Sequence, residues 1–544
     1  MKSEYLDASA YPSRRNTEPE KCEGMSNLAV INIAGISSLA YESIFGGPSA
    51  FERVILWTDS IPQIAGVILL ADNEAEIPKD AAEIQQESAD KFSAPLGIIR
   101  RSNWTDKILI EALEVAARTN PNGNTLDALF YVWGDSPLID PKLSKTLWDL
   151  HYKYNADYTF ADGYPLGMAP EILASALPGK LIPYAENRHL PPARDSIFEV
   201  LRKDINSFNV ETHLSKKDMR MERISITCDT RRNLNIANKL YKQGGRDAES
   251  LCEIIPKSQL LLRDIPAFLP IQITDHCPQA CSYCPFPKHH GDPRRGSTHI
   301  ETAKFAELRK KIVDFVPDAV IGLSLWGEPS SHPDIRELID IALGPASSQT
   351  RLLIETSAIG WSHEMLENIA LKVDRKRIMW IVSLDAADPV LYEKLRGERR
   401  EEAEATAEVL VNLFGSSCWV QAVRMKDNEE HLRVFHQSWK NKNAQTIIQK
   451  YSSFAAYLPE LQPSNLSPLQ RFPCWHLKRD MPILLDGTVP ICREDMRKKI
   501  VLGNALKDDI EKIWTAGEAL YREHVAGSYP GPCAVCDEYY TFNF

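Results

Sequence analysis

Three cysteines lie close together in the segment TDHCPQACSYCPFP, where Cys277, Cys281 and Cys284 follow the spacing CxxxCxxC. Thiolates bind zinc, copper and iron–sulfur clusters, and a structural zinc ion takes four protein ligands. The nearby histidines are His276, His289 and His290. The spacing therefore predicts a metal centre in this segment, either a zinc ion completed by a histidine or a centre whose fourth position is left to another ligand.

A second group of cysteines lies toward the end of the chain, in PCWHLKRDMPILLDGTVPIC and GPCAVCDEYYTF: Cys474, Cys492, Cys533 and Cys536. Thiolates from two separated pairs can close around one centre, and four of them complete either a zinc ion or a [4Fe–4S] cluster. This group therefore needs no outside ligand, unlike the first. The remaining cysteines are isolated, and we interpret them as buried apolar residues or incidental thiols: Cys22, Cys228, Cys252 and Cys418.

The composition indicates an ordinary folded protein, because 44% of its 544 residues are hydrophobic and 25% are charged. The net charge of −11 argues against a general nucleic-acid binder. No apolar run reaches the roughly 20 residues that span a bilayer, and the N-terminus has no apolar secretory segment. The cysteine usage does not indicate a disulfide framework. These features predict a cytoplasmic protein that binds neither nucleic acid nor a membrane.

The elements that position these residues begin after a polar tail, residues 1–26, which we expect to be disordered. Residues 27–245 alternate apolar runs with helical patterns, and the expected strands are LAVINIAG, AGVILLAD, ALFYVWGD and ISITCDT. Strands separated by helices predict a parallel α/β sheet, whose ligands bind at the carboxyl ends of the strands. The last three strands each run into an aspartate, the residue type from which a metal–nucleotide site is built.

A second series of strands follows a polar connector, residues 246–265, and occupies residues 266–460. The expected strands are FLPIQIT, DAVIGLSLWGE, RLLIET, RIMWIVSLD, CWVQAVRM and AQTIIQKY. Six βα units on a right-handed path predict a partial, open (β/α)6 barrel. The three-cysteine segment follows the first strand and so falls at the end of the barrel where barrel enzymes gather their chemistry. Residues 461–544 are expected to form a small Cys-rich C-terminal domain.

The CxxxCxxC segment after a barrel strand, with Tyr283 before its last cysteine, resembles the radical SAM family over about residues 265–455. The resemblance implies that Cys277, Cys281 and Cys284 hold three irons of a [4Fe–4S] cluster and that S-adenosylmethionine (SAM) binds the fourth. It also implies the family's chemistry, in which the reduced cluster cleaves SAM to methionine and a 5′-deoxyadenosyl radical that abstracts hydrogen from a substrate.

The segment SLWGEPSSHPD resembles the GGEP motif of this family, which cradles the amino group of the methionine moiety. Trp326 stands where the family has its first glycine, and the matching residues are Gly327, Glu328 and Pro329. The third strand departs from the family, because it ends in Thr-Ser-Ala where relatives often have Thr-Asn-Gly.

The segment VSLDAADPVLYEKLRG resembles the fourth strand of the family. There Ser383 and Asp385 would accept hydrogen bonds from the ribose hydroxyls of SAM. Arg396 is a candidate contact to the substrate or to the methionine carboxylate, and a surface ion pair is its alternative role. With Tyr283 and the GEP residues, these are the expected cofactor-binding side chains.

The C-terminal cysteines resemble the SPASM domain, which carries auxiliary clusters behind a radical SAM barrel. The fuller SPASM pattern has more cysteines and two clusters. The four cysteines of this chain therefore imply one auxiliary [4Fe–4S] cluster, ligated fully by protein and suited to electron relay. A structural zinc ion is the alternative.

Residues 27–245 resemble the cytidylyltransferases that activate surface sugars, and the resemblance places Asp135 and Asp229 at the positions that hold Mg²⁺ and the nucleotide. The first loop departs from that family, because SSLAYESIF carries no Lys or Arg to neutralise triphosphate charge. We therefore expect a nucleotidyltransferase-like domain that is degenerate and binds a substrate or serves as a scaffold.

The order of the three parts resembles the multidomain proteins called spiro-SPASM. We expect a radical SAM enzyme whose substrate is a peptide, a protein or a nucleotide-linked sugar and whose reductant is a flavodoxin or ferredoxin. The alternatives are a non-catalytic scaffold that binds iron–sulfur clusters or zinc, and a nucleotidyltransferase that acts on sugars. No catalytic acid or base is assigned from the sequence.

Overall fold

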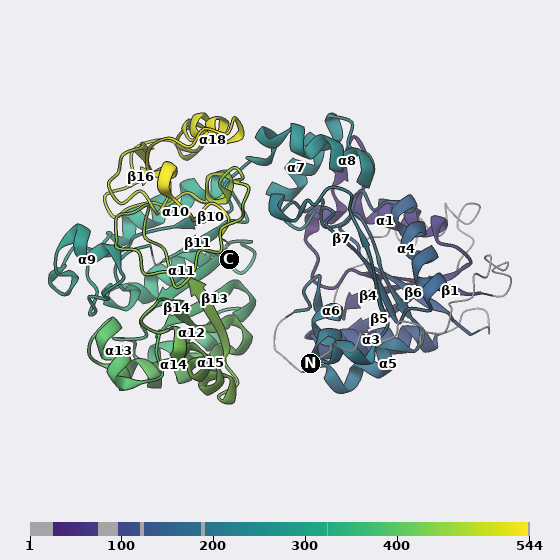
Figure 1. Ribbon diagram of the computed structural model, residues 1–544, viewed down its shortest axis with the longest axis horizontal. Coiled ribbons are helices and arrows are strands. Elements are labelled where there is room, and N and C mark those ends of the chain that lie inside the picture. The colour runs from purple at the N-terminus through teal and green to yellow at the C-terminus, as the bar shows by residue number, and fades with distance from the viewer. Residues whose placement is uncertain (1–24, 74–95, 120–124, 187–190, 324, 542–544) are drawn as a thin grey trace, which may run out of the picture.

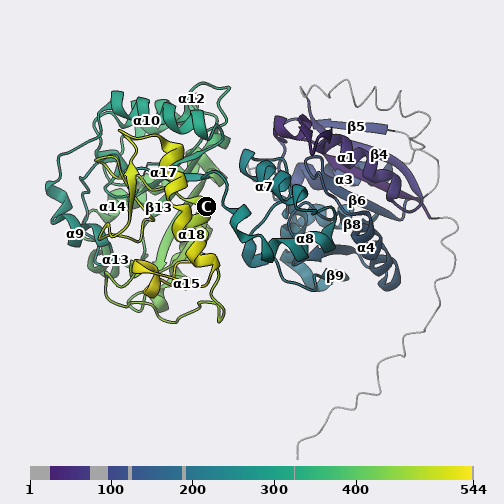
Figure 2. The same cartoon turned by 90° about the horizontal axis from the view of Figure 1, so that it is seen from above.

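The computed structural model describes residues 25–73, 96–119, 125–186, 191–323 and 325–541, so the expected tail lies outside the described residues except for Met25 and Ser26. The chain forms two lobes that lie side by side (Figures 1 and 2). Residues up to α8 (Ala248–Ile254) form the N-terminal lobe, and the barrel with the C-terminal segment forms the other. No helix within the described ranges is long and apolar enough to cross a membrane.

The N-terminal lobe is built on a seven-stranded sheet in the order β5–β4–β1–β6–β8–β7–β9. Its strands are β1 (Asn27–Asn32), β4 (Ile64–Asp72), β5 (Leu96–Arg101), β6 (Ala128–Trp133), β7 (Tyr158–Asp162), β8 (Glu171–Ala174) and β9 (Val210–Leu214). β8 runs antiparallel to both β6 and β7, whereas the other neighbouring strands are parallel. The expected α/β class is confirmed, with one reversed strand that the sequence did not indicate. A small hairpin joins β2 (Ser43–Ile44) to β3 (Gly47–Ser49).

Helices cover both faces of this sheet. In β1, Leu28 and Val30 pack toward one layer of helices, whereas Ala29 and Ile31 pack toward the other, as the two-residue period of a strand requires. The first layer contains α3 (Asp106–Arg118), α5 (Leu177–Leu181) and α6 (Ser196–Leu201). The second contains α1 (Ala50–Trp57) and α4 (Pro141–Tyr154).

The segment ISITCDT is not a strand of this sheet, so that prediction is wrong. It forms a single bridge, between Ser225 and Leu166. Its apolar side chains are buried instead against α7 (Arg231–Lys242), where Ile226 packs in one cluster with Ile236 and Leu240. A short buried apolar run has the same sequence pattern whether a strand or a helix covers it.

The second lobe contains a six-stranded sheet in the sequential order β10 to β15, with every neighbouring pair parallel. The strands are β10 (Phe268–Pro270), β11 (Val320–Gly322), β12 (Arg351–Thr356), β13 (Ile378–Ser383), β14 (Cys418–Arg424) and β15 (Gln445–Lys450). The helices between them are α9 (Pro285–His290), α10 (Thr302–Phe315), α11 (Ile335–Leu343), α12 (His363–Lys372), α13 (Pro389–Arg396), α14 (Arg400–Phe414) and α15 (Leu432–Asn441). The predicted six βα units and open barrel are confirmed.

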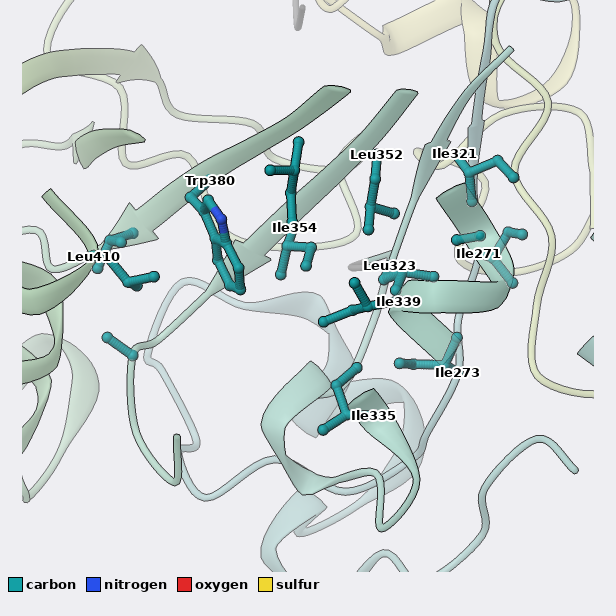
Figure 3. Packing of buried hydrophobic residues seen from close by; sticks show 14 of the residues in the cluster. Ile271, Ile273, Ile321, Leu323, Ile335, Ile339, Leu352, Ile354, Trp380 and Leu410 are labelled. Atoms are coloured by element: carbon teal, nitrogen blue, oxygen red, sulfur yellow. The ribbon is translucent and has the colours of Figure 1, made fainter. Parts of the chain in front are cut away.

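The two faces of the barrel strands carry different side chains. Leu352 and Ile354 of β12 point toward the surrounding helices, in the same cluster as Ile339 of α11 and Leu410 of α14 (Figure 3). Their neighbour Glu355 therefore points to the opposite, inner face. The helices fix the outer face of the sheet, and the inner face is left to line a cavity.

The C-terminal segment contains α16 (Trp475–Arg479), an antiparallel pair of β16 (Thr488–Pro490) and β17 (Val501–Asn504), α17 (Ile510–Ala516) and α18 (Glu518–Val525). Residues 479–483 lie along the free edge of β10. The N–H groups of Met481 and Ile483 donate to the carbonyl oxygens of Phe268 and Pro270, at 3.0 and 2.9 Å. The C-terminal segment thus extends the barrel sheet at its first strand.

Candidate functional site

The three-cysteine loop connects β10 to α9 and is held by backbone hydrogen bonds to other elements. The N–H of Cys277 donates to the carbonyl oxygen of Pro293 at 3.0 Å, and the N–H of Ser282 donates to that of Leu395 at the end of α13 at 2.9 Å. Within the loop, the N–H of Cys284 donates to the carbonyl oxygen of Cys281 at 3.1 Å. These bonds fix the direction of the loop at the C-terminal end of the barrel.

A cavity of about 190 Å³ lies at this end of the barrel. It is lined by residues that the sequence predicted separately: Cys277, Cys281, Cys284, Tyr283, Gly327, Glu328, Ser383 and Arg396. They come from the loop after β10 and from the ends of β11, β13 and α13. The fold therefore gathers the cysteine loop, the GEP turn and the fourth-strand segment around one space. Pro329 follows Glu328 and begins a short 3-10 turn, Pro329–Ser331.

The chemistry of the three thiols fits a metal centre. Burial raises the pKa of each of them, that of Cys284 to about 12. Thiolate, not thiol, is the metal-binding form, so ionisation at neutral pH requires a strong positive charge nearby. A metal centre supplies that charge and deprotonates its cysteine ligands.

Gly327 brings the GEP turn against the cysteine loop. Its φ of +82° is left-handed, and a Cβ atom there would lie 2.4 Å from the carbonyl oxygen of Thr274 and 3.1 Å from that of His276. The next residue, Glu328, donates its N–H to the carbonyl oxygen of His276 at 2.8 Å. Only glycine fits this contact, which places the Glu328 side chain at the cavity wall.

Glu328 is buried and held from the third strand. The hydroxyl of Thr356 donates to its Oε1 at 2.5 Å, and the N–H of Ser357 donates to its Oε2 at 2.7 Å. Both residues also line the cavity. The sequence did not assign them a role, because Thr-Ser-Ala departs from the family pattern, but their place at a strand end was the available signal.

Arg396 is buried and is not a surface side chain. Its Nη1 donates to Asp385 Oδ2 at 2.5 Å and to the Tyr283 hydroxyl at 2.6 Å, and its Nε and Nη2 donate to Gln279 Oε1 at 3.1 and 2.9 Å. The helix that carries it begins at Pro389 and is capped by Asp388, which accepts from the N–H of Leu391 at 2.8 Å. This network joins the cysteine loop to the fourth strand.

Both carboxylate oxygens of Asp385 accept hydrogen bonds from other groups of the protein. Beside Arg396 and Tyr283, Asp385 accepts a hydrogen bond on Oδ1 from the N–H of Val423 at 2.7 Å. Its side chain is fully buried, and the cavity is lined by its neighbour Ser383 instead. The predicted contact of Asp385 with a ribose stays a prediction, and its observed contacts hold other side chains.

A second compartment of about 390 Å³ adjoins the first, and the two share a polar set of lining residues: Glu355, Gln421, Gln449, Lys450 and Tyr451. Its outer wall comes from the C-terminal segment, with Glu538, Tyr540 and Thr541. Lys450 pairs with Asp537 at 2.7 Å and contacts Glu538. The combined space is therefore rich in hydrogen-bonding groups.

The four C-terminal cysteines gather in a second place, where their charges interact. Cys474 and Cys533 are buried in one apolar cluster with Leu477, Tyr521 and Tyr539. Burial raises the pKa of all four thiols, that of Cys533 to about 11, and the negative charges of the other three cysteines add to this effect at Cys492. The arrangement suits a shared, positively charged centre.

The two cysteine groups are linked through one residue. Arg493 follows Cys492 directly and lines the barrel cavity beside the three-cysteine loop.

Within the described ranges, no three or more His, Cys, Asp or Glu side chains are grouped as ligands of a single metal ion. In a [4Fe–4S] cluster each cysteine sulfur binds a different iron, so the thiolates are spaced more widely than around one ion.

In the N-terminal lobe, Asp135 and Asp229 lie on either side of Arg194. Its Nη2 is 2.5 Å from Asp135 Oδ2 and 3.6 Å from Asp229 Oδ2. A guanidinium group thus stands between the two carboxylates predicted to hold Mg²⁺. The sequence did not point to Arg194, because no motif marks the loop before α6. The Mg²⁺ site stays a prediction.

Comparison with known proteins places these features in families. Residues 271–437 match the radical SAM superfamily, and residues 474–537 match SPASM, an iron–sulfur cluster-binding domain. An uncharacterized protein of Treponema pallidum (strain Nichols) is 34% identical over 365 residues, which cover 64% of this chain and 98% of that protein. A second uncharacterized protein of the same organism is 28% identical over 165 residues, or 29% of this chain and 72% of that one.

Solved structures are similar at low identity. SuiB of Streptococcus suis bound to S-adenosylmethionine is 16% identical, covering 63% of this chain and 84% of that chain, with a TM-score of 0.41. A cytidylyltransferase of Leptospira borgpetersenii serovar Hardjo-bovis is 17% identical, covering 44% of this chain and 96% of that chain, with a TM-score of 0.34. The chain therefore contains a radical SAM domain, residues 271–437, followed by a C-terminal SPASM domain, residues 474–537.

Proposed function

We propose that this protein cleaves SAM reductively in the barrel cavity and uses the resulting radical to modify a polar substrate. The observation that carries the proposal is that three cysteines, the GEP turn and the fourth-strand segment line one cavity. Cys277, Cys281 and Cys284 would hold a [4Fe–4S] cluster there, and that cluster would supply the one electron needed to cleave SAM to methionine and a 5′-deoxyadenosyl radical, which abstracts hydrogen from a C–H bond.

The residues of the chain would hold SAM by complementary groups. Glu328 keeps an acceptor site beside those used by Thr356, Ser357 and the N–H of Ser330, because an ionised carboxylate has about four. It is suited to the amino group of the methionine moiety. Ser383 lines the cavity and is suited to a ribose hydroxyl.

Arg396 and Asp385 act together in this proposal. Arg396 lines the cavity while its guanidinium is fixed by Gln279, Tyr283 and Asp385. It is suited to a carboxylate of SAM or of the substrate, since guanidinium groups bind carboxylates strongly. Asp385 would act by positioning Arg396 and Tyr283.

The substrate is proposed to enter the second compartment, which adjoins the SAM cavity. The compartment presents a carboxyl group, two amides, an ammonium group and a phenol, from Glu355, Gln421, Gln449, Lys450 and Tyr451. Such walls suit a substrate with many hydrogen-bonding groups, either a peptide or a nucleotide-linked sugar, over an apolar one.

The four C-terminal cysteines are proposed to hold one auxiliary [4Fe–4S] cluster that relays electrons, because a complete set of four thiolates leaves no position for a substrate. Cys492 and Arg493 connect this centre to the barrel cavity. The proposed reductant is a flavodoxin or ferredoxin in the cytoplasm, where a low-potential electron is supplied and thiols stay reduced.

The test is anaerobic reconstitution with iron and sulfide, followed by dithionite and SAM, with 5′-deoxyadenosine measured by mass spectrometry. We expect 5′-deoxyadenosine from the wild type, and iron near eight atoms per chain for two clusters. Iron near four would indicate a single cluster. Absence of 5′-deoxyadenosine from the iron-loaded wild type would contradict the enzymatic proposal and favour a scaffold.

Two cysteine variants sharpen this test. Cys277→Ala is expected to abolish SAM cleavage and to halve the iron content, because the C-terminal set remains. Cys418→Ala is the matched control, since Cys418 is buried on β14 and lies outside the residues that line the cavity. Equal loss of cleavage in both variants would show that the effect is not specific to the three-cysteine loop.

A further inference from the structure

A separate cavity of about 570 Å³ lies where the two lobes meet. The N-terminal lobe contributes residues after β7 and at the start of α7, including Tyr164, Arg223 and Arg232. The other lobe contributes Arg351 at the start of β12 and Arg479 at the end of α16. Both views show α7 on the face of the N-terminal lobe that meets the barrel (Figures 1 and 2).

The wall of this junction cavity is strongly cationic. Its charged lining residues are five arginines and two aspartates, a net formal charge of +3: Arg220, Arg223, Arg232, Arg351, Arg479, Asp162 and Asp318. Asp162 pairs with Arg220 at 3.2 Å, and Asp318 accepts from the N–H of Arg231 at 2.7 Å. The excess charge in a chain of net charge −11 marks this place as different from the rest of the molecule.

The arginines repel one another inside the protein. Burial lowers the pKa of Arg232 to about 10, and the charge of Arg479 adds to the effect. Burial and Arg479 likewise lower the pKa of Arg223. Burial, with a smaller contribution from Arg351, lowers the pKa of Arg479, against the effect of Asp480, whose Oδ1 lies 3.5 Å from Arg479 Nη1. Buried cations that repel one another cost stability unless an anion joins them.

One donor of this group is left without a partner. Arg232 donates from Nη2 to the carbonyl oxygen of Leu262 at 2.8 Å, but its Nε is buried and has no hydrogen-bond partner in the described structure. An unsatisfied buried donor on a cation is a costly arrangement that a bound acceptor removes.

Two further features support an anionic ligand. Arg223, Arg232, Lys478 and Arg479 all lie within 6.0 Å of the Trp475 ring centre, so the indole holds their charges in one place. The N-terminus of the 12-residue helix α7 contributes Thr230, Arg232 and Asn233 to the wall. A helix N-terminus adds partial positive charge to that of the side chains.

We propose that the junction cavity binds a phosphate-bearing small molecule through Arg223, Arg232, Arg351 and Arg479. One guanidinium group can bind two phosphate oxygens at once. Several guanidinium groups together suit a ligand with more than one negative charge. The cavity shares Asp162, Tyr164 and Leu166 with an aromatic-lined cavity of about 480 Å³ in the N-terminal lobe. A diphosphate ligand therefore has adjoining space for an organic group. The site does not depend on radical chemistry.

The test is anaerobic titration calorimetry of the full, iron-loaded chain with inorganic pyrophosphate and, separately, UDP-N-acetylglucosamine, at 50 and 200 mM salt. We expect wild-type binding that weakens at the higher salt. Tighter binding of the sugar nucleotide would identify an organic diphosphate as the source, and equal or tighter binding of pyrophosphate would identify the free anion. Either result supports the site.

Variants distinguish this cavity from general attraction to positive charge. Arg351→Gln removes an exposed member and Arg232→Gln a half-buried one, and each is expected to weaken binding at least tenfold. Arg433→Gln is the control, because Arg433 is exposed on α15 and lies outside the cavity, and its binding should change less than twofold. The proposal is overturned if wild type does not bind either probe, or if Arg433→Gln weakens binding as much as Arg351→Gln.

Discussion

Gly327 shows how the absence of a single side-chain atom sets the geometry of the cavity. We predict that Gly327→Ala destabilises the protein by about 3 kcal/mol, from left-handed strain together with overpacking, because the new Cβ would lie 2.4 Å from the carbonyl oxygen of Thr274. It should also lower iron retention at the three-cysteine loop. Thermal unfolding and iron analysis measure both effects.

Gly291→Ala is the matched control for this change. Gly291 has a similar φ of +87°, but no atom lies within 4 Å of the position of its Cβ. We expect it to cost less than Gly327→Ala, because it adds only the backbone strain of its φ of +87° and ψ of −157° and no overpacking. Equal effects of the two substitutions would show that the close approach of the GEP turn is unimportant.

Arg396 and Asp385 form a buried ion pair, with 5% and 0% of their side-chain surfaces exposed. Removing one partner leaves the other charge buried, so Arg396→Met should destabilise the barrel by about 3–5 kcal/mol. Arg399→Met removes an exposed arginine paired with Glu402 and should cost under about 1 kcal/mol. Urea unfolding of both variants checks the contrast. Similar midpoints would contradict the structural role given to Arg396.

Some residues of the site can be recognised in the sequence, and others cannot. The three loop cysteines, Glu328 and Ser383 stand in motifs with fixed spacing, and the structure brings them to one cavity. Arg194 and Gln279 have no such spacing, because their partners are reached only through the tertiary fold: Arg194 lies 59 positions from Asp135, and Gln279 lies 117 positions from Arg396. Contacts of this kind follow from packing and not from local pattern.

Among the elements, the barrel strands were predictable because the segments between successive apolar runs are long enough to form a helix. The reversed strand β8 was not, since its four residues EILA do not differ in pattern from a short helical turn. The segment ISITCDT was wrongly predicted to be a strand, because its buried apolar residues pack against α7 and not within the sheet. The period and length of an apolar run predict which residues are buried. They predict less firmly whether those residues form a strand or a helix.

The packing of α4 on β7 predicts a pH dependence. His151 of α4 is buried and its Nδ1 lies 2.9 Å from the hydroxyl of Thr159, and burial lowers its pKa from 6.5 to about 4. Between pH 6.5 and about pH 4, His151 is therefore protonated in the unfolded chain and neutral in the folded chain. Stability is fully present above pH 6.5 and is lost as the pH falls toward 4, by at most about 3 kcal/mol.

The measurement is thermal unfolding of the N-terminal lobe between pH 7 and 4. His151→Gln should flatten this part of the profile, because the titrating group is gone. His431→Gln, which changes an exposed histidine of the other lobe, should leave it unchanged. A profile that is equally steep in the His151 variant would assign the pH dependence to other groups.

At the scale of the whole molecule, the two lobes should respond differently to loss of iron. The N-terminal lobe has its own apolar cores, on both faces of its sheet. The core of the C-terminal segment instead includes Cys474 and Cys533 themselves. Removing the clusters with a chelator should lower the unfolding temperature of the barrel lobe and leave that of the N-terminal lobe in place, because metal binding adds directly to folding free energy.

Calorimetry of the loaded and chelated protein measures the two transitions. Cys492→Ser should shift the same transition as the chelator does, though by less, since the three-cysteine loop keeps its centre. If both transitions move together, the lobes unfold as one unit, and the junction contacts are stronger than those within the C-terminal segment.

The pairing of residues 479–483 with β10 has a consequence for how the chain is made. Ile271 and Ile483 bridge across about 200 residues, so at roughly 20 residues per second the ribosome needs about 10 s to deliver the partner of the first barrel strand. During that time β10 presents an open edge, the kind of backbone surface on which nascent chains join one another. The edge of the first barrel strand is therefore covered only after every other strand of that sheet has been synthesised.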